Sequence, residues 1–179
     1  MINVALFGFG RIGQMHGENL FKHPKFNLKY VYDRDIQLAK KAEKMFDAKS
    51  IKNYKDALKD KSISVIFIAS STPTHINFIR EAALHKKTIF CEKPLDLDLN
   101  KIVKCKKYIK KFSPRVQLGF NRRYDPGHYY LKKSIEQKRI GTLQKIIITC
   151  RDPAPPPLAY LKTAGGIFKD MIIHDFDLI

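Results

Sequence analysis

The chain has 179 residues, of which 44% are hydrophobic, so it can bury a sizeable core and is not disordered as a whole. Its apolar runs are far shorter than the roughly 20 residues of a membrane-spanning helix, and no basic stretch precedes the first of them, which argues against a bilayer span and a secretory signal. The net charge of +17 points to a polyanion partner, but the basic residues are spread out and densest at 101–111, where they favour a solvated helix face over a nucleic-acid patch.

The first clear pattern lies at residues 2–7, an uncharged apolar run that predicts a strand buried on both faces. Gly8, Gly10 and Gly13 follow it in G-x-G-x-x-G spacing, and a helical pattern occupies 11–22. In such a unit the first glycine allows a tight turn, the second lets backbone approach a pyrophosphate, and the third lets the helix pack on the strand. The helix N-terminus then presents free N–H groups and the positive end of its dipole to the phosphates.

A second apolar run at 28–32 ends at Asp33, which lies far enough beyond Gly13 to accept hydrogen bonds from a ribose diol. Asp33 would repel a 2′-phosphate, which favours NAD, while the neighbouring Arg34 leaves NADP open. With strand, helix, second strand and acid in order, the segment predicts a dinucleotide site. The alternative is a tight turn that binds no ligand.

Strands and helices alternate over the first 120 residues, which predicts a Rossmann-type, doubly wound α/β fold with helices on both faces of a parallel sheet. The predicted strands lie at 2–7, 28–32, 63–69, 87–91 and 115–119. The predicted helices lie near 11–22, 35–47, 54–60, 73–86 and 99–112. Thr72 is expected to cap the fourth helix, with Pro73 at its first position. Residues 70–72 then form a loop at the carboxyl end of a central strand, where such sheets bind ligands.

The character of the sequence changes near residue 120, and we expect a dinucleotide-binding domain at 1–120 and the start of an α+β domain at 121–179. The second part contains a β-like run at 144–151, a proline-rich extended loop at 152–157 and a glycine pair, 165–166, that opens a final helix. Nothing follows that helix to cover its apolar side chains. The second domain is therefore expected to be cut short.

Glu92, Lys93 and Pro94 follow the predicted strand at 87–91. Pro94 stiffens this turn and biases Lys93 toward an extended backbone. A lysine at the carboxyl end of a strand, beside a nucleotide cleft, can polarise a substrate oxygen or hydrogen-bond an alcohol. The alternative is an ordinary loop lysine in a chain that has many.

Asp170 and His174 are four residues apart on the predicted last helix and would share a face, with Asp177 continuing the stripe. A carboxylate beside an imidazole can fix its tautomer and make it a proton acceptor. One alternative is a polar helix face with a structurally satisfied histidine. A metal site from these three side chains is a weaker one, because no cysteine or second histidine lies near. Residues 121–124 (Asn-Arg-Arg-Tyr) add polar groups near the same cleft, or form a basic linker.

Together these motifs resemble the Gfo/Idh/MocA family of glucose–fructose oxidoreductases and inositol dehydrogenases over the whole chain. The matching segments are Gly8–Gly13, Ser71–His75, Cys91–Asp96, Gly119–Pro126 and the residues from Gly165 to Asp177. The loop at 151–157 resembles the inositol 2-dehydrogenase branch. Members of the family continue for well over a hundred further residues and form oligomers. The resemblance therefore implies a C-terminally truncated chain whose complete form is a homo-oligomer, a dimer or a tetramer.

The resemblance also implies roles for individual residues. The implied catalytic residues are Lys93, Asp170 and His174. The implied cofactor contacts are Gly8, Phe9, Gly10, Arg11, Ile12, Gly13, Asp33, Arg34, Ser71, Thr72, His75, Glu92 and Lys93. The implied substrate contacts are Lys93, Asn121, Arg123, Asp152, Asp170 and His174. No metal ion is expected.

The predicted function is NAD-dependent oxidation of a cyclic polyol, myo-inositol, to its 2-keto product. His174 would take the hydroxyl proton, Asp170 would orient His174, and Lys93 would stabilise the developing alkoxide. The alternatives are another sugar or polyol oxidoreductase of this family, a nucleotide-binding fragment without catalysis, and a basic nucleic-acid binder. Neither nucleic acid nor a membrane is expected as a partner. The three cysteines form no C-x-x-C pair, which suits reduced thiols in the cytoplasm.

Overall fold

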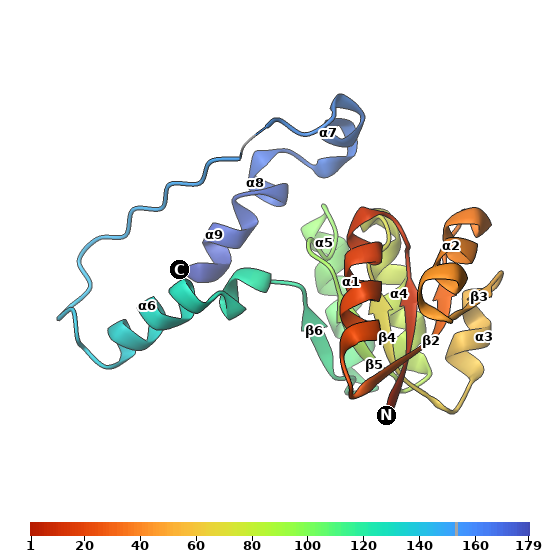
Figure 1. Cartoon of the computed structure of the whole chain (residues 1–179). Coiled ribbons are helices and arrows are strands. Elements are labelled where there is room, and N and C mark those ends of the chain that lie inside the picture. The colour runs from red at the N-terminus through yellow and green to blue at the C-terminus, as the bar shows by residue number, and fades with distance from the viewer. Residues whose placement is uncertain (153) are drawn as a thin grey trace. The chain divides into compact units, whose positions relative to one another are not determined.

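The computed structural model describes residues 1–152 and 154–179 and divides into two compact units (Figure 1). The N-terminal unit is Met1–Gly119 and the C-terminal unit is Phe120–Ile179. In the described part of the chain, every helix is too short or too polar to cross a membrane.

The N-terminal unit is built on one six-stranded sheet whose strand pairs are all parallel. The strands are β1 (Ile2–Phe7), β2 (Phe26–Tyr32), β3 (Lys49–Ile51), β4 (Ile63–Ile68), β5 (Thr88–Cys91) and β6 (Val116–Leu118). Their order across the sheet is β3-β2-β1-β4-β5-β6, so the direction of winding reverses between β1 and β4. This is the strand order of a Rossmann fold, and the predicted fold class is confirmed.

Helices cover both faces of the sheet, as the strand–helix alternation predicted. They are α1 (Arg11–Lys22), α2 (Ile36–Phe46), α3 (Tyr54–Lys59), α4 (Thr72–Leu84) and α5 (Leu99–Lys110). One apolar cluster joins α1 and α2 to the sheet through residues such as Leu6 and Leu20. A second cluster joins α3, α4 and α5 to the other face. Alternate residues of β1 point to opposite faces, so Leu6 belongs to the first cluster and Phe7 to the second.

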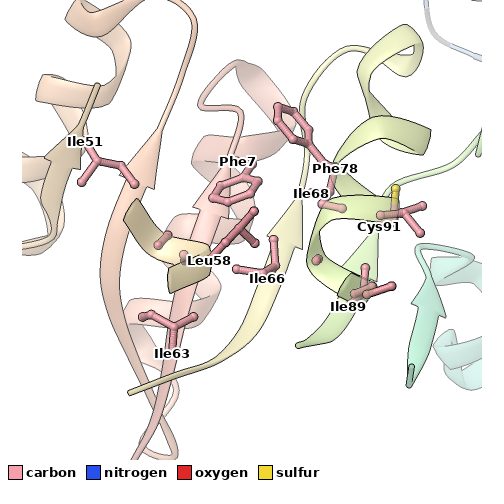
Figure 2. Packing of buried hydrophobic residues seen from close by; sticks show 14 of the residues in the cluster. Phe7, Ile51, Leu58, Ile63, Ile66, Ile68, Phe78, Ile89 and Cys91 are labelled. Atoms are coloured by element: carbon pink, nitrogen blue, oxygen red, sulfur yellow. The ribbon is translucent and has the colours of Figure 1, made fainter. Parts of the chain in front are cut away.

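The second cluster is rich in aromatic and branched aliphatic side chains. Figure 2 shows Phe7, Ile66 and Ile68 of the central strands packed beneath Phe78 of α4. The rings of Phe7 and Phe78 meet edge to face, with centroids 5.1 Å apart. The central strands are thus anchored from both faces, and the loops at their ends start from fixed positions.

Two local features differ from the sequence predictions. Strand β3 was not predicted, because Ile51 is the only buried apolar residue among its three and an edge strand this short leaves no alternating pattern. The cap of α4 is Ser71 rather than Thr72, and its side chain makes no capping hydrogen bond. Thr74 instead donates from Oγ1 to the carbonyl of Ser71 at 2.7 Å. The side-chain hydrogen bond in the first turn therefore comes from a residue within the helix.

A polar cluster around Asp60 ties together the amino end of the sheet, opposite the loops that carry the predicted site. Lys29 Nζ and Tyr30 Oη donate to Asp60 Oδ2 at 2.7 and 3.0 Å, and the amide of Ser62 donates to Oδ1 at 2.8 Å. The hydrogen bond from Lys29 is the main cause of a pKa of Asp60 far below its usual value. Lys87 Nζ donates to the backbone carbonyl of Asp60 at 2.7 Å, and burial lowers the pKa of this lysine.

The C-terminal unit consists of short helices and extended chain in its described residues. They are the 3₁₀ helix η1 (Asn121–Tyr124), α6 (Pro126–Glu136), α7 (Leu158–Ala164), α8 (Ile167–Asp170) and α9 (Ile173–Leu178). The β-like run at 144–151 pairs with no strand in the described part of the chain, so the prediction of a strand there was wrong. An isolated strand leaves its N–H and C=O groups without ladder partners. The predicted loop at 152–157 contains no helix or strand where it is described, and residue 153 lies outside the described residues.

The predicted final helix is broken in two. A continuous helix would carry a hydrogen bond from the amide of His174 to the carbonyl of Asp170. That amide donates to the carbonyl of Met171 instead, at 3.2 Å, and the amide of Ile172 reaches back to Ile167 at 3.0 Å. The regular four-residue spacing is lost at this point, so the argument that Asp170 and His174 share one helix face does not hold.

Candidate functional site

The loops that carry the predicted cofactor residues gather at the carboxyl end of the parallel sheet. The ladder is extended there by amides that follow the strands: Ala69 donates to the carbonyl of Phe7 at 2.8 Å, and Glu92 donates to Ile68 at 2.9 Å. The loops after β1 and β4 leave neighbouring strands where the winding reverses. A ligand of an open α/β sheet binds in the crevice at such a switch point.

The glycine loop is tightly packed on its inner side and open on its outer side. Gly8 has φ +96°, and a Cβ there would lie 2.4 Å from the amide nitrogen of Ser70. A Cβ on Gly13 would lie 2.1 Å from the carbonyl oxygen of Gly8. Gly10, by contrast, has no atom within 4 Å of the position of a Cβ. The loop therefore presents bare backbone at Gly10, which is what close approach of a pyrophosphate requires.

The first turn of α1 supplies donors beside this loop. The first helical hydrogen bond runs from the amide of Gln14 to the carbonyl of Gly10, at 2.9 Å. In the described part of the chain no protein acceptor is found for the amides of Arg11, Ile12 and Gly13. The first turn also contains no acidic side chain. Open amides and the positive end of a twelve-residue helix dipole fit an anionic diphosphate.

Asp33 follows β2 and is fixed by backbone donors. Its Oδ2 accepts from the amide of Phe9 at 2.6 Å, and its Oδ1 accepts from the amide of Asp35 at 2.9 Å. The carboxylate thus braces the glycine loop, and each oxygen keeps a second lone pair for a ribose hydroxyl. Arg34 beside it is exposed. Phe9 itself is fully buried in the α1–α2 cluster, so only its backbone could face a cofactor.

The loop after β4 places its predicted residues differently. Ser71 is exposed and Thr72 is partly exposed at the start of α4. His75 is 1% exposed, and both ring nitrogens lie within hydrogen-bonding distance of backbone carbonyls: Nδ1 is 2.8 Å from Pro94 O and Nε2 is 2.9 Å from Ser70 O. This imidazole joins two loops and is too buried to touch a ligand.

The turn after β5 carries Lys93, and its preceding carboxylate has partners on both oxygens. Glu92 Oε1 lies 2.7 Å from His16 Nε2, and Glu92 Oε2 accepts from the amide of Lys93 at 3.2 Å. The side chains of His16 and Glu92 are 14% and 18% exposed. Lys93 is partly exposed, and its peptide bond to Pro94 is cis.

Arginines of η1 and carboxylates of α9 are paired in the C-terminal unit. Arg123 binds Asp177 through two parallel hydrogen bonds of 2.7 and 2.6 Å, and Arg122 pairs with Asp175. The pKa of Arg123 is raised, chiefly by its hydrogen bond to Asp177. These pairs tie η1 to α9 and give the carboxylates of Asp175 and Asp177 cationic partners.

Asp170 has a hydrogen-bond donor that the sequence did not indicate. Tyr160 Oη of α7 donates to Asp170 Oδ1 at 2.7 Å. The His174 ring lies edge-on to the ring of Phe120, with centroids 6.3 Å apart. Asp170 and His174 are both partly buried, whereas Asn121 and Asp152 are exposed.

The structure therefore brings the predicted cofactor residues together within the N-terminal unit and places Asp170 and His174 in the other unit. Sequence reasoning missed two side chains, His16 and Tyr160. His16 is a polar residue on the face of α1 that also carries Ile12 and Leu20, which is a usable signal, but its partner is 76 residues away. No group of three His, Cys, Asp or Glu side chains suited to a metal ion occurs among the described residues.

Comparisons with known proteins agree with this arrangement. Residues 2–120 match the model of the Gfo/Idh/MocA family, described as an oxidoreductase family with an NAD-binding Rossmann fold. The chain is 39% identical to a myo-inositol 2-dehydrogenase of Thermotoga maritima over 99% of this chain and 53% of the relative. The chain thus spans about half the length of the curated relatives it matches.

Solved structures give the same picture. A myo-inositol dehydrogenase from Corynebacterium glutamicum is 36% identical with a TM-score of 0.93, covering 99% of this chain and 54% of that one. A scyllo-inositol dehydrogenase from Lactobacillus casei, solved with bound NAD(H) and scyllo-inositol, is 29% identical with a TM-score of 0.87. The matched shares are 99% of this chain and 55% of that one.

Proposed function

This chain belongs to the Gfo/Idh/MocA family of oxidoreductases with an NAD-binding Rossmann fold, and from this premise we propose that it serves NAD-dependent oxidation of a cyclic polyol, myo-inositol, to the 2-keto product. The observation that carries the proposal is the glycine loop, where the exposed backbone at Gly10 adjoins three amides that have no protein acceptor among the described residues. The inositol dehydrogenases among the relatives support the substrate class.

The cofactor proposal assigns the diphosphate to the loop after β1 and the first turn of α1. The open amides of Arg11, Ile12 and Gly13 would donate to phosphate oxygens. Asp33 would accept from the ribose hydroxyls with its remaining lone pairs, and its charge would disfavour a 2′-phosphate. NAD is therefore preferred to NADP, although Arg34 is exposed beside this carboxylate.

In the proposed reaction the cofactor accepts the hydride, and side chains of the protein handle the proton and the developing charge. Bound NAD supplies the hydride acceptor at nicotinamide C4. His174 takes the proton from the reacting hydroxyl, and Lys93 donates to the oxygen as negative charge develops on it. Asp170 is proposed to orient His174 on the family resemblance alone, because the break in the helix at 171–172 removes the spacing argument for this pair. Tyr160, which donates to Asp170, would keep that carboxylate in place. Asn121 and Asp152 are exposed and are proposed to contact the polyol. Arg123 is a weaker candidate for that role, because Asp177 occupies its guanidinium.

The first test is calorimetric titration of the 179-residue chain with NAD and, as the matched control, with NADP. We expect saturable binding of NAD and weaker binding of NADP. Absence of NAD binding to the folded chain would contradict the cofactor proposal. Tighter binding of NADP would contradict the role assigned to Asp33.

The second test compares Lys93→Ala with Lys101→Ala, an exposed lysine on α5. In a form of the protein that includes the C-terminal region of its relatives, loss of the group that stabilises the alkoxide should lower kcat for inositol oxidation about 100-fold or more. The melting temperature should stay near that of the parent in both variants, and in Lys93→Ala the loss of kcat should far exceed any loss of NAD affinity. Near-normal turnover by Lys93→Ala would end the catalytic assignment.

A second candidate function is oxidation of a different sugar or polyol. It is favoured by the scyllo-inositol dehydrogenase among the solved structures. A panel of myo-inositol, scyllo-inositol and glucose separates the candidates by kcat/KM. The homo-oligomer implied by the family resemblance is also a proposal, and light scattering of the purified chain tests it.

A further inference from the structure

Two histidines that the proposed chemistry does not use contact the turn that carries Lys93. His16 comes from α1 and His75 from α4, and these helices cover opposite faces of the sheet. We propose that both are positioning residues, which hold the Glu92–Lys93–Pro94 turn in shape so that the Lys93 amine is presented in one place. The catalytic consequence rests on the proposed role of Lys93, whereas the effect on the turn itself does not.

His16 holds the turn through Glu92. Its ring packs against the stacked rings of Phe67 and Phe90, with centroids 5.4 and 5.2 Å away, so its orientation is set by packing. Nε2 meets Glu92 Oε1 at 2.7 Å, and the other carboxylate oxygen accepts from the amide of Lys93. A packed imidazole thus fixes a carboxylate, and the carboxylate fixes the backbone of Lys93. Side chains arranged in such a series restrain a catalytic group without touching the substrate.

Gly119 is fitted to the same carboxylate. It is buried after β6, and a Cβ there would lie 2.9 Å from Glu92 Oε2 and 3.0 Å from Oε1. A methyl group at Gly119 would therefore push Glu92 away from its two partners. This gives a way to disturb the turn without changing either histidine.

His75 holds the turn from the other face. The ring lies 2.8 Å from the carbonyl of Pro94 and 2.9 Å from that of Ser70. Both partners are carbonyl oxygens, which only accept, so the ring donates to one of them as a neutral imidazole and to both as an imidazolium. Because it is 1% exposed, it cannot act on a ligand directly. His75 therefore ties the turn of Lys93 to the loop that begins α4.

Substitution by asparagine or glutamine can keep a nitrogen in the place of one ring nitrogen of each histidine and remove the other. A glutamine amide nitrogen can occupy the place of Nε2, and an asparagine nitrogen that of Nδ1. His16→Gln should keep the contact with Glu92, and His16→Phe should lose it while retaining a ring against the two phenylalanines. His75→Asn should keep the link to Pro94, and His75→Gln should keep only the link to Ser70. His85→Phe is the matched control, because His85 Nδ1 also lies near a backbone carbonyl, that of Glu81, at the far end of α4.

The experiment measures hydrogen exchange of the Lys93 amide, the melting temperature and NAD affinity in each variant. We expect His16→Phe, His75→Gln and Gly119→Ala to raise the exchange rate of that amide at least tenfold. His16→Gln, His75→Asn and His85→Phe should stay near the parent rate. An unchanged exchange rate in folded His16→Phe and His75→Gln would overturn the proposal. If His16→Phe fails to fold, Gly119→Ala decides the role of Glu92 in the same way.

Turnover of inositol then separates this inference from the proposed function. In a chain that turns over, the loosened variants should lose kcat about tenfold while the NAD dissociation constant changes little. Equal losses in kcat and in NAD affinity would indicate a general structural role and overturn the positioning claim. A parent chain that binds NAD without turnover would contradict the proposed function, and the exchange rates would still decide whether the histidines hold the turn.

Discussion

Substitution of Gly10 by alanine should separate cofactor binding from folding. Gly10 caps α1 with φ −67°, which any residue adopts, and a Cβ there meets no atom within 4 Å. Alanine in place of a glycine cap should cost at most about 1 kcal/mol of folding stability. If the diphosphate approaches the backbone here, however, the methyl group occupies the space it needs. We expect a loss of NAD affinity of at least about tenfold, which is about 1.4 kcal/mol.

Gly13→Ala is the matched substitution, and its main effect should be on folding stability rather than on NAD binding alone. A Cβ at Gly13 would lie 2.1 Å from the carbonyl oxygen of Gly8 and 2.8 Å from its carbonyl carbon. Both atoms belong to the backbone, so they cannot turn aside as the end of a side chain could. Overpacking of this kind should cost about 3 kcal/mol or more, at the upper end of its usual range. This variant should therefore lose stability and cofactor affinity together.

Thermal melts and calorimetric titration with NAD, run on the parent chain and both variants, decide between these expectations. Gly10→Ala should melt near the parent temperature and bind NAD weakly, whereas Gly13→Ala should melt well below it. Parent-like NAD affinity in Gly10→Ala would refute the placement of the diphosphate at this loop. A large fall in melting temperature for Gly10→Ala would show that the space beside it is not open.

Two further predictions concern titration and reactivity. The hydrogen bond from Lys29 holds the pKa of Asp60 below its usual value of 3.8, so the carboxylate contributes stability above that value and loses it as the pH falls. In urea denaturation at neutral pH, Asp60→Asn should therefore have a lower free energy of unfolding than the parent. This difference in free energy should narrow below about pH 4, and a difference that stays constant with pH would contradict the prediction. Burial raises the pKa of the Cys91 and Cys105 thiols, whereas Cys150 is exposed. A thiol reagent should therefore label native protein at Cys150 first, and the Cys150→Ser variant should react only on unfolding.

Much of the N-terminal unit could be predicted from local patterns. The apolar run at β1 and the helical pattern of α1 match the observed Ile2–Phe7 and Arg11–Lys22. Both elements bury their apolar residues against one continuous sheet, so the spacing of apolar residues in the sequence matches the pattern of burial. Strand β3 escaped prediction because its position comes from pairing with β2 rather than from its own residues.

The C-terminal unit was less predictable. Four-residue spacing placed Asp170 and His174 on one helix, but the chain changes its hydrogen bonding at Met171 and Ile172. Nothing in the sequence near Asp170 indicates its partner Tyr160, because that contact joins two separate helices. Pairing of Arg123 with Asp177 likewise spans 54 residues.

The sequence by itself determined the class of the fold and the glycine loop, since both follow from residues close together along the chain. It also identified Lys93 as a residue of interest from the turn that contains it. Only the tertiary structure decided that Phe9 and His75 are buried, and that Glu92 lies between His16 and the backbone of Lys93. The physical reason is that hydrogen bonds between distant segments depend on how the helices and strands pack. Contacts of this kind produce no local pattern in the sequence from which they could be predicted.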